Sequence, residues 1–367
     1  MKVLIAAGGS GGHIFPAIAL ARTLKYKYVN VVIRFIGSNK VLDKRIFEKE
    51  GFNFSLLSAN SLPHKASLRL VIFFIRLLFD VVKSFFVVVS YRPDVVAAFG
   101  GYVACPVIFV SYIFRIPSIA HEQNVTPGRA NAIIFKLADR IAISFDGTKK
   151  FLGSDIKKAI FTGNPIRWEL LQDDKESGIA KFGLNKNKFT ILVIGGSQGA
   201  HFLNQTFIGA LSKLKQDLKS SLQVIHITGL KDYEWAINSY KDLGAVEHRV
   251  YSFIDRIEEA YSASDLVVTR SGASAIFEIA FFARPMILIP YPFAMSHQEE
   301  NAKVFSKIGA AVEIDEHNLS NELFKNTILS LVSDRDRLKN MAEAAKRLSV
   351  PEASSNLARE VLNLNRI

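Results

Sequence analysis

The chain contains the same short pattern twice, and this repeat restricts its fold more than any other feature. Residues 3–13 read V-L-I-A-A-G-G-S-G-G-H, and residues 191–201 read I-L-V-I-G-G-S-Q-G-A-H. Each copy is an apolar run, then glycines and a serine, then small residues that can begin a helix. An apolar strand that leads through glycines into a helix is typical of the start of a Rossmann-like α/β unit. Two copies in 367 residues predict two such units in one chain.

Apolar, β-branched runs follow each copy and are separated by amphipathic stretches. This alternation is typical of a parallel, doubly wound sheet. We expect strands at 2–7, 31–37, 94–99, 118–121, 140–144, 190–194, 223–228, 265–269 and 286–290, and a helix at 14–24. The predicted fold is therefore α/β, with two Rossmann-like domains facing a cleft. We place the domains at 1–163 and 164–367, with a linker near 162–168, and leave open whether the final helix packs back on the first domain.

The glycine turns predict anion binding, because such a turn exposes backbone N–H groups and a helix N-terminus. A dinucleotide site of the G-x-G-x-x-G type would need glycine at Ile14. It would also need an acidic residue directly after the second strand, where residues 37–40 read Gly-Ser-Asn-Lys. A P-loop would need Lys followed by Ser or Thr after the glycines, and neither copy has it. The turns therefore either bind phosphate in another way or only connect strand to helix.

The net charge of +12 is concentrated in the first half of the chain. Residues 1–160 hold 22 Lys and Arg against 9 Asp and Glu, whereas residues 161–367 hold 24 against 25. This asymmetry predicts an anionic partner for the first domain, either nucleic acid or an acidic membrane surface. The one cysteine, Cys105, argues against a disulfide framework or a cysteine-based zinc site. The first residues lack a signal-peptide pattern, so we expect a cytoplasmic protein.

The segment 68–91 is rich in phenylalanine and carries basic residues every seven positions. A membrane-spanning helix would place Arg76, Asp80 and Lys83 in the middle of the bilayer, at a cost of several kcal/mol. A helix buried in the core would place the basic side chains of this stripe in apolar surroundings, which is unfavourable. We therefore expect the segment to dock on an anionic membrane surface, and not on nucleic acid. The predicted patch is Arg69, Phe73, Phe74, Arg76, Phe79 and Lys83, extended by Lys65 and Arg92.

An ordered set of further motifs resembles the MurG family of glycosyltransferases, nearly from end to end. The first half carries 8–16 (G-G-S-G-G-H-I-F-P), 92–96 (R-P-D-V-V), 100–103 (G-G-Y-V) and 121–124 (H-E-Q-N). The second carries 163–167 (G-N-P-I-R), 195–200 (G-G-S-Q-G-A), 253–255 (F-I-D), 270–273 (R-S-G-A), Glu278 and 297–298 (H-Q), before 301–302 (N-A). Each motif is weak alone, but the ordered set is specific.

The resemblance implies an inverting transferase with the glycosyltransferase-B fold. It implies transfer of N-acetylglucosamine from UDP-N-acetylglucosamine to undecaprenyl-pyrophosphoryl-N-acetylmuramyl-pentapeptide, that is, lipid I to lipid II. The expected process is peptidoglycan synthesis, and through it cell wall biogenesis, cell shape and cell division. We expect no cofactor and no bound metal, and a peripheral position on the cytoplasmic face of the inner membrane. The Asp-x-Asp pattern at 334–336 lies in a basic, helical region and does not resemble a metal cage.

The same resemblance implies a donor site in the second half of the chain. Ser197 and Arg167 would hold the diphosphate, and the Glu278 carboxylate would accept hydrogen bonds from the ribose hydroxyls. Ile254 would present its backbone to uracil. The full donor set is Ser10, Gly11, Gly12, Asn124, Arg167, Ser197, Ile254, Ala273, Ser274, Glu278, His297 and Gln298. One departure from the family is Ala275, which stands beside Ser274 where relatives usually carry a hydroxyl.

His13 is the candidate catalytic base, because a neutral imidazole can take the proton of the attacking sugar hydroxyl. The alternative is that His13 donates a hydrogen bond to the acceptor's phosphate or fixes the loop. Rival functions are another UDP-sugar enzyme of the same fold, such as a glycolipid synthase or an epimerase, and a catalytically silent membrane-binding protein. The rival enzymes would lack the motifs at 100–103 and 121–124.

Overall fold

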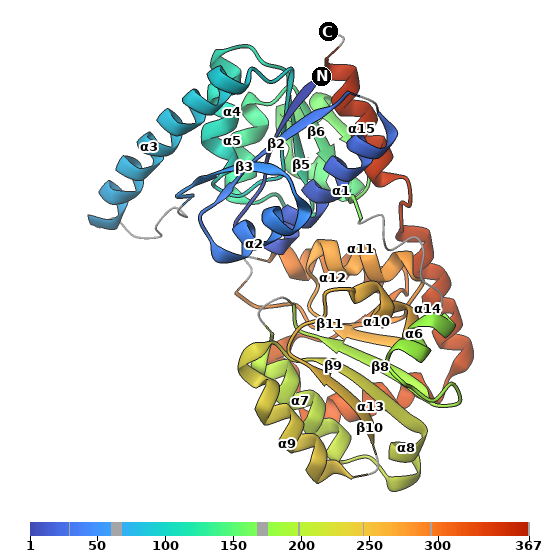
Figure 1. Ribbon diagram of the computed structural model, residues 1–367. Coiled ribbons are helices and arrows are strands. Elements are labelled where there is room, and N and C mark those ends of the chain that lie inside the picture. Colours follow the sequence, from blue (N-terminus) through green and yellow to red (C-terminus); the bar gives the residue numbers. More distant parts are fainter. Residues whose placement is uncertain are drawn as a thin grey trace. The chain divides into compact units, whose positions relative to one another are not determined.

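The structure, a computed structural model, describes residues 1–28, 30–59, 68–166, 175–196, 199–244, 246–293 and 296–365. It divides into two compact units, unit 1 with Met1–Trp168 and Val350–Ile367, and unit 2 with Glu169–Ser349. Each unit is built on a sheet whose described strands pair in parallel, with helices packed against it (Figure 1). The predicted fold of two doubly wound α/β units is therefore confirmed.

The sheet of unit 1 has the strand order β3-β2-β1-β4-β5-β6-β7. The strands are β1 (Lys2–Ala6), β2 (Val32–Ser38), β3 (Asn53–Leu57), β4 (Val95–Ala98), β5 (Ser118–Glu122), β6 (Arg140–Ile143) and β7 (Ala159–Phe161). The helices are α1 (Gly11–Lys27), α2 (Val41–Glu50), α3 (Leu68–Tyr91), α4 (Ala104–Ile113), α5 (Arg129–Leu137), η1 (Asp146–Phe151), η2 (Gly153–Lys158) and α15 (Ala353–Leu364). The order in which the chain adds strands to the sheet reverses between β1 and β4. In this fold class, ligands bind beside such a reversal, at the carboxyl ends of the strands.

Strand β1 shows why this sheet is covered on both faces. Because side chains alternate along a strand, Val3 and Ile5 enter one apolar core while Leu4 and Ala6 enter another. The first core is closed by α1 and α15, and the second by α3, α4 and α5. Helix α15 is also fixed by polar contacts, since the Ser354 hydroxyl donates to the Ile166 carbonyl over 3.1 Å. The last helix of the chain therefore belongs to unit 1.

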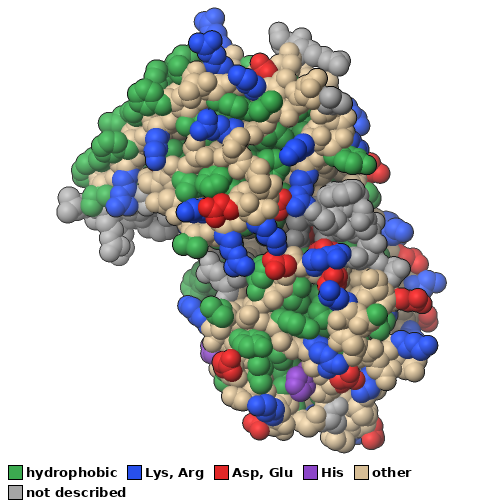
Figure 2. Space-filling view, in the orientation of Figure 1, with side chains coloured by type: hydrophobic (Ala, Val, Ile, Leu, Met, Phe, Trp, Pro, Cys, Tyr) green, Lys and Arg blue, Asp and Glu red, His purple; other side chains and the backbone are tan. Residues whose placement is uncertain are grey.

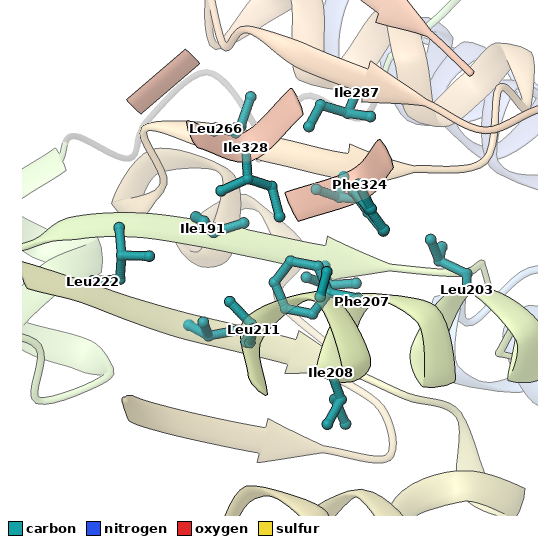
Figure 3. Packing of buried hydrophobic residues seen from close by; sticks show 14 of the residues in the cluster. Ile191, Leu203, Phe207, Ile208, Leu211, Leu222, Leu266, Ile287, Phe324 and Ile328 are labelled. Atoms are coloured by element: carbon teal, nitrogen blue, oxygen red, sulfur yellow. The ribbon is translucent and has the colours of Figure 1, made fainter. Parts of the chain in front are cut away.

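The sheet of unit 2 has the strand order β10-β9-β8-β11-β12-β13. The strands are β8 (Phe189–Ile194), β9 (Leu222–Ile227), β10 (Glu247–Tyr251), β11 (Leu266–Thr269), β12 (Met286–Leu288) and β13 (Ala311–Glu313). The helices are α6 (Lys175–Lys181), α7 (His201–Ser212), α8 (Gln216–Ser221), η4 (Leu230–Asp232), α9 (Tyr233–Leu243), α10 (Ile257–Ala263), α11 (Ala273–Phe281), α12 (His297–Lys307), η5 (Glu316–Asn318), α13 (Asn321–Val332) and α14 (Arg335–Leu348). Figure 3 shows how side chains from the sheet, α7 and α13 meet in one core, in which Phe207 and Phe324 pack with ring centroids 5.7 Å apart.

Candidate functional site

The first glycine turn joins β1 to α1 and holds the candidate base. Gly9 has a φ of +89°, which favours glycine, and α1 begins directly after Ser10. Ser10, Gly11 and Gly12 thus form the start of α1, and His13 lies in its first turn. The His13 Nδ1 atom lies 3.2 Å from the Gly8 carbonyl oxygen and 3.3 Å from the Ser10 hydroxyl.

These contacts fix the proton on the His13 ring. A carbonyl oxygen can only accept, so the hydrogen bond with Gly8 requires that Nδ1 carries the proton. In the neutral ring the lone pair then lies on Nε2, the nitrogen that a base would use. Gly101 packs beside this ring, because a Cβ built on it would lie 3.4 Å from His13 Nδ1 and 3.0 Å from the Gly8 oxygen. The motif Gly100-Gly101 therefore makes room for the turn that carries His13.

The motif His121–Asn124 forms a buried network at the end of β5. The Gln123 amide nitrogen donates to the Phe99 carbonyl over 3.0 Å and to His121 Nδ1 over 3.1 Å. His121 Nε2 must then carry the proton, and it donates to the Gly163 carbonyl over 3.2 Å. Burial, with a smaller contribution from nearby His13, lowers the pKa of His121 to about 4, against the raising effect of the Gly163 hydrogen bond. His121 is therefore a neutral structural residue near pH 7.

Glu122 organises the loop that follows β5. Its carboxylate accepts from the Asn124 backbone and side-chain nitrogens, over 2.9 and 3.1 Å, and from the Asn131 side chain, over 2.6 Å. Burial raises the pKa of Glu122, and these hydrogen bonds oppose that rise. Asn124, which the sequence predicts to reach the donor, is thus oriented by Glu122. The motif at 121–124 did not predict a role for Glu122, although an acid directly after the apolar run at 118–121 was a signal for one.

In unit 2, two helix N-termini come together at the carboxyl ends of β11 and β12. The Ser271 hydroxyl donates to the Gln298 carbonyl over 2.8 Å, and the Asn301 side chain donates to the Ser271 carbonyl over 3.1 Å. These contacts tie the start of α11 to the first turn of α12. The predicted donor residues Ala273 and Ser274 are the first two residues of α11, and His297 and Gln298 are the first two residues of α12.

The side chains of this unit 2 site are held by specific partners. Gln298 accepts at Oε1 from the Tyr291 backbone N–H over 3.0 Å. Arg270 donates to the Ile289 carbonyl over 3.1 Å, forms an ion pair with Glu316, and lies over the Tyr291 ring.

Glu278, the predicted ribose ligand, is largely buried on α11. Only 6% of Glu278 is exposed, and the Tyr261 hydroxyl donates to its carboxylate over 3.4 Å. Ile254 lies half-buried in the loop after β10. Arg167 and Ser197, the residues predicted to hold the diphosphate, lie outside the described residues.

A buried chain of hydrogen bonds supports the second glycine turn. Asn204 donates to the Asp232 carboxylate over 2.7 Å and accepts from His226 Nε2, with 3.1 Å between the two atoms. His226 Nδ1 accepts from the Tyr240 hydroxyl over 2.9 Å. His201, the first residue of α7, completes the chain with Nδ1 at 2.8 Å from Asp232. Burial lowers the pKa of His226 to about 3, although Asp232 opposes this effect.

Helix α3 has an inner and an outer apolar face. Phe73, which the sequence assigned to the membrane patch, is only 8% exposed and packs edge-on against Tyr102, so this assignment was wrong. Asp80, the one acidic residue in the sequence of α3, also faces inward, and its carboxylate accepts from the backbone and hydroxyl of Ser58 and from the Ala59 N–H. The outer face is therefore left without an acidic side chain. The Arg69 side chain and Lys65 lie outside the described residues.

The outer face of α3 continues onto the end of α4. We call this surface the docking face. It consists of Val71, Ile72, Phe74, Ile75, Leu78, Phe79, Val82, Phe85, Phe86 and Val89 of α3 together with Phe109, Tyr112, Ile113 and Phe114. Phe79 and Phe86 are 69% and 65% exposed, and Figure 2 shows hydrophobic side chains along the α3 edge of unit 1 with basic ones among them. Arg76, Lys83, Arg92 and Arg115 are exposed in or beside this face.

Neither a membrane-spanning helix nor a metal cluster occurs among the described residues. Within that part of the chain, no helix has both the length and the apolar character needed to cross a bilayer. Within the same residues, no three His, Cys, Asp or Glu side chains gather as metal ligands do. Asp334 caps α14 instead, by accepting from the Arg337 N–H over 2.8 Å.

Comparisons with known proteins identify the family. The N-terminal and C-terminal domains of glycosyltransferase family 28 match residues 3–143 and 190–357. The UDP-N-acetylglucosamine--N-acetylmuramyl-(pentapeptide) pyrophosphoryl-undecaprenol N-acetylglucosamine transferase of Halothermothrix orenii is 36% identical over 97% of both chains. That of Bacillus subtilis is 35% identical over 97% of this chain and 98% of its own. The crystal structure of Acinetobacter baumannii MurG, 25% identical, superposes with a TM-score of 0.77 over 99% of this chain and 100% of that one.

The chain belongs to the MurG family. The resemblance seen in its motifs is thereby confirmed, as is the glycosyltransferase-B fold. UDP-N-acetylglucosamine 2-epimerase from Neisseria meningitidis, bound to UDP-N-acetylglucosamine, superposes with a TM-score of 0.71 at 13% identity, over 99% of this chain and 100% of that one. At that identity the likeness shows the fold alone, so the motifs and not the fold separate MurG from the epimerases.

Proposed function

We propose that this MurG-family chain transfers N-acetylglucosamine from UDP-N-acetylglucosamine to undecaprenyl-pyrophosphoryl-N-acetylmuramyl-pentapeptide in peptidoglycan synthesis. The observation that carries this function is an identity of 34–36% with transferases of that name over 97% of the chain. The motifs at 100–103 and 121–124 separate this family from the rival enzymes, and both contact predicted site residues. Gly101 packs on the turn that carries His13, and Glu122 orients Asn124. An epimerase or a silent protein is therefore not favoured.

The proposed step is one displacement at the anomeric carbon of the donor sugar. The acceptor hydroxyl oxygen forms the new bond to that carbon, and its proton passes to His13 Nε2. The bond between the anomeric carbon and the phosphate oxygen breaks, and its electron pair leaves with UDP. Attack opposite the leaving group inverts the α-linked donor to a β-linked product. The tautomer set by the Gly8 carbonyl supports His13 as the base.

Unit 2 supplies the groups proposed to bind the donor. The N-termini of α11 and α12 are joined through Ser271, and the backbone N–H groups of a helix N-terminus can bind phosphate. These groups, with Arg167, would stabilise the charge that develops on UDP. Gln298 would bind a sugar hydroxyl through its amide nitrogen, since its oxygen already accepts from Tyr291. Glu278, which accepts from the Tyr261 hydroxyl, would also accept hydrogen bonds from the ribose hydroxyls.

A transfer assay tests this function. We expect labelled sugar to pass from UDP-N-acetylglucosamine to a lipid-pyrophosphate-linked acceptor, and a β-linked disaccharide to form. UDP-glucose should be used at least about 100-fold less well, because it lacks the acetamido group that the site would bind. Without acceptor, the UDP-sugar should keep its configuration. A UDP-sugar that changes configuration without acceptor would instead identify an epimerase.

We further propose that unit 1 binds the cytoplasmic face of the inner membrane through the docking face. Its exposed phenylalanine and aliphatic side chains would enter the boundary of the acyl chains, and its basic residues would meet anionic headgroups. The inward position of Asp80 supports this, because an exposed carboxylate would be repelled by such a surface. A lipid-linked acceptor makes binding of this kind useful, since the acceptor never leaves the membrane.

Co-sedimentation with vesicles separates the contribution of the apolar side chains to membrane binding from that of the basic residues. Replacing Arg76 and Lys83 with glutamine should weaken binding to anionic vesicles roughly 30-fold, at about 1 kcal/mol per charge, and should leave weak binding to neutral vesicles unchanged. Replacing Phe79 and Phe86 with serine should weaken binding to both. The matched controls are Lys186 and Lys215 to glutamine and Leu230 to serine, which change exposed residues of unit 2. Equal binding of the protein to neutral and anionic vesicles would contradict the role of charge.

A further inference from the structure

Asp43 is a buried acid of unit 1 for which the proposed mechanism has no use. It lies in the first turn of α2 and is fully buried. Three donors converge on its Oδ2 atom: the Gly9 N–H at 2.9 Å, the Ser38 N–H at 2.9 Å and the Ser38 hydroxyl at 2.6 Å. Its Oδ1 atom is buried and has no hydrogen-bond partner among the residues that the structure describes. A buried oxygen without a partner costs roughly 1–3 kcal/mol, so a residue that only filled space would be better as an apolar one.

The peptide unit between Gly8 and Gly9 connects this acid to His13. The Gly9 N–H and the Gly8 carbonyl belong to the same trans peptide and therefore point in opposite directions. On one side the N–H donates to Asp43 Oδ2, and on the other the carbonyl accepts from His13 Nδ1 over 3.2 Å. A negative charge on the N–H side polarises the peptide and increases the electron density on its carbonyl oxygen. A carboxylate, one peptide group and an imidazole are thus linked in series.

The packing around this peptide leaves it little freedom. A Cβ on Gly8 would lie 2.5 Å from Asp43 Oδ2 and 2.7 Å from the Ser38 nitrogen, so the turn rests directly on the acid. On the other side, a Cβ on Gly101 would lie 3.0 Å from the Gly8 oxygen. The carbonyl that faces His13 therefore has a fixed direction.

We propose that Asp43 is a positioning residue for His13, which acts through the Gly8–Gly9 peptide to hold the ring in its Nδ1–H tautomer and to strengthen Nε2 as a base. In hydrolases of several folds a carboxylate holds the catalytic histidine directly. Here one peptide group lies between them. The inference rests on the proposed role of His13, and its test is chosen so that the two can fail separately.

Other charged and titratable groups also bear on His13. The Lys40 ammonium, at the start of α2, donates to the Gly9 carbonyl over 2.7 Å, and His121 on β5 interacts electrostatically with the His13 ring. Lys40 is exposed, whereas His121 stays neutral near pH 7 because it is buried. Asp43 and Lys40 are therefore the charges that should shift the His13 titration, and they should shift it in opposite directions.

The test is a titration of His13 by nitrogen NMR on the full chain labelled at its eight histidines, with His13→Gln used to assign the signal. Asp43→Asn keeps an oxygen that can accept from Gly9 but removes the charge. We expect it to lower the His13 pKa by roughly one unit and to increase the share of the Nε2–H tautomer. Asp43→Glu, which restores the charge, should recover part of the shift. Lys40→Met should raise the same pKa by a smaller amount, because solvent screens an exposed charge.

Turnover measurements on the same variants complete the design. We expect Asp43→Asn to lower kcat roughly 10-fold at pH 7, to move the acid limb of the kcat/KM profile by the shift seen in NMR, and to leave the KM for UDP-N-acetylglucosamine within twofold. If Asp43→Asn does not fold, Asp43→Glu serves as the test, because a carboxylate displaced from the Gly9 N–H should still lower the His13 pKa, by a smaller amount. A His13 pKa and tautomer unchanged in a folded Asp43→Asn protein would overturn the inference. A shifted His13 pKa with an unmoved kcat/KM profile would support the link to Asp43 and reject His13 as the base.

Discussion

Replacing His13 with alanine is expected to lower kcat roughly 10²- to 10⁴-fold, the contribution typical of one positioned proton acceptor. The attacking hydroxyl would then have to release its proton to water as the new bond forms. Donor affinity should change little, because the residues proposed to contact uridine and diphosphate belong mainly to unit 2. The measurement is steady-state transfer at saturating acceptor, together with a calorimetric Kd for UDP, which should stay within about threefold of wild type.

The chain supplies its own control for this experiment in His201. His201 ends the second copy of the repeated pattern as His13 ends the first, and its Nδ1 atom is also fixed, by Asp232 at 2.8 Å. On local geometry alone His201 could act as a base, so His201→Ala tests whether the effect is specific. We expect this variant to retain kcat within severalfold. A loss of turnover in His201→Ala but not in His13→Ala would mean that the proton acceptor belongs to unit 2.

The alternative role of His13 gives a different kinetic result. If the ring only donated a hydrogen bond to the acceptor's phosphate, His13→Ala would raise the KM for the acceptor and leave kcat nearly unchanged. His13→Gln distinguishes the two further, since glutamine can still donate a hydrogen bond but cannot accept a proton at neutral pH. Recovery of activity in His13→Gln would favour the phosphate contact, and continued loss would favour the base.

The sequence predicted the central strands of both sheets and none of the edge strands. β4 and β9 are buried along their whole length and therefore read as continuous apolar runs. The missed strands β3, β7, β10 and β13 all lie at sheet edges, where most positions are only partly buried. Such short, half-exposed strands carry no clear pattern, because pairing with a single neighbour and not burial defines them.

At the site, too, the sequence could not predict the features that depend on tertiary packing. Motif spacing predicted site roles for His13 and Gln298, and both roles stay predictions. It could not separate Phe73 from Phe74, because α3 is apolar on both faces and only packing against Tyr102 decides which phenylalanine is buried. Asp43 was also missed. A dinucleotide site would carry an acid directly after the second strand, whereas Asp43 lies on the following helix and contacts the glycine turn.

Acid is expected to destabilise unit 2 through His226, with a loss of roughly 1.4 kcal/mol in the free energy of unfolding per pH unit below about pH 6.5. Burial lowers the pKa of folded His226 to about 3, whereas an unfolded histidine titrates near its ordinary value of 6.5. Between these values the unfolded state binds a proton that the folded state excludes. The stabilisation is therefore complete above pH 6.5 and is lost as the pH falls toward 3. His121 should act in the same sense in unit 1, down to about pH 4, while Glu122, whose pKa burial raises, acts in the opposite sense.

The measurement uses urea unfolding followed by tryptophan fluorescence between pH 7.5 and 4.5. The chain has two tryptophans, so a Trp168→Phe background leaves Trp235 of α9 as the reporter of unit 2.

The informative comparison is with His226→Gln, because glutamine can still accept from Tyr240 and donate to Asn204 but does not titrate. Its stability near pH 7 should be lower than that of the parent chain, since the ring no longer fills its space. Its dependence on pH should be weaker by about one proton, and an equally steep loss in both proteins would mean that His226 is already protonated in the fold.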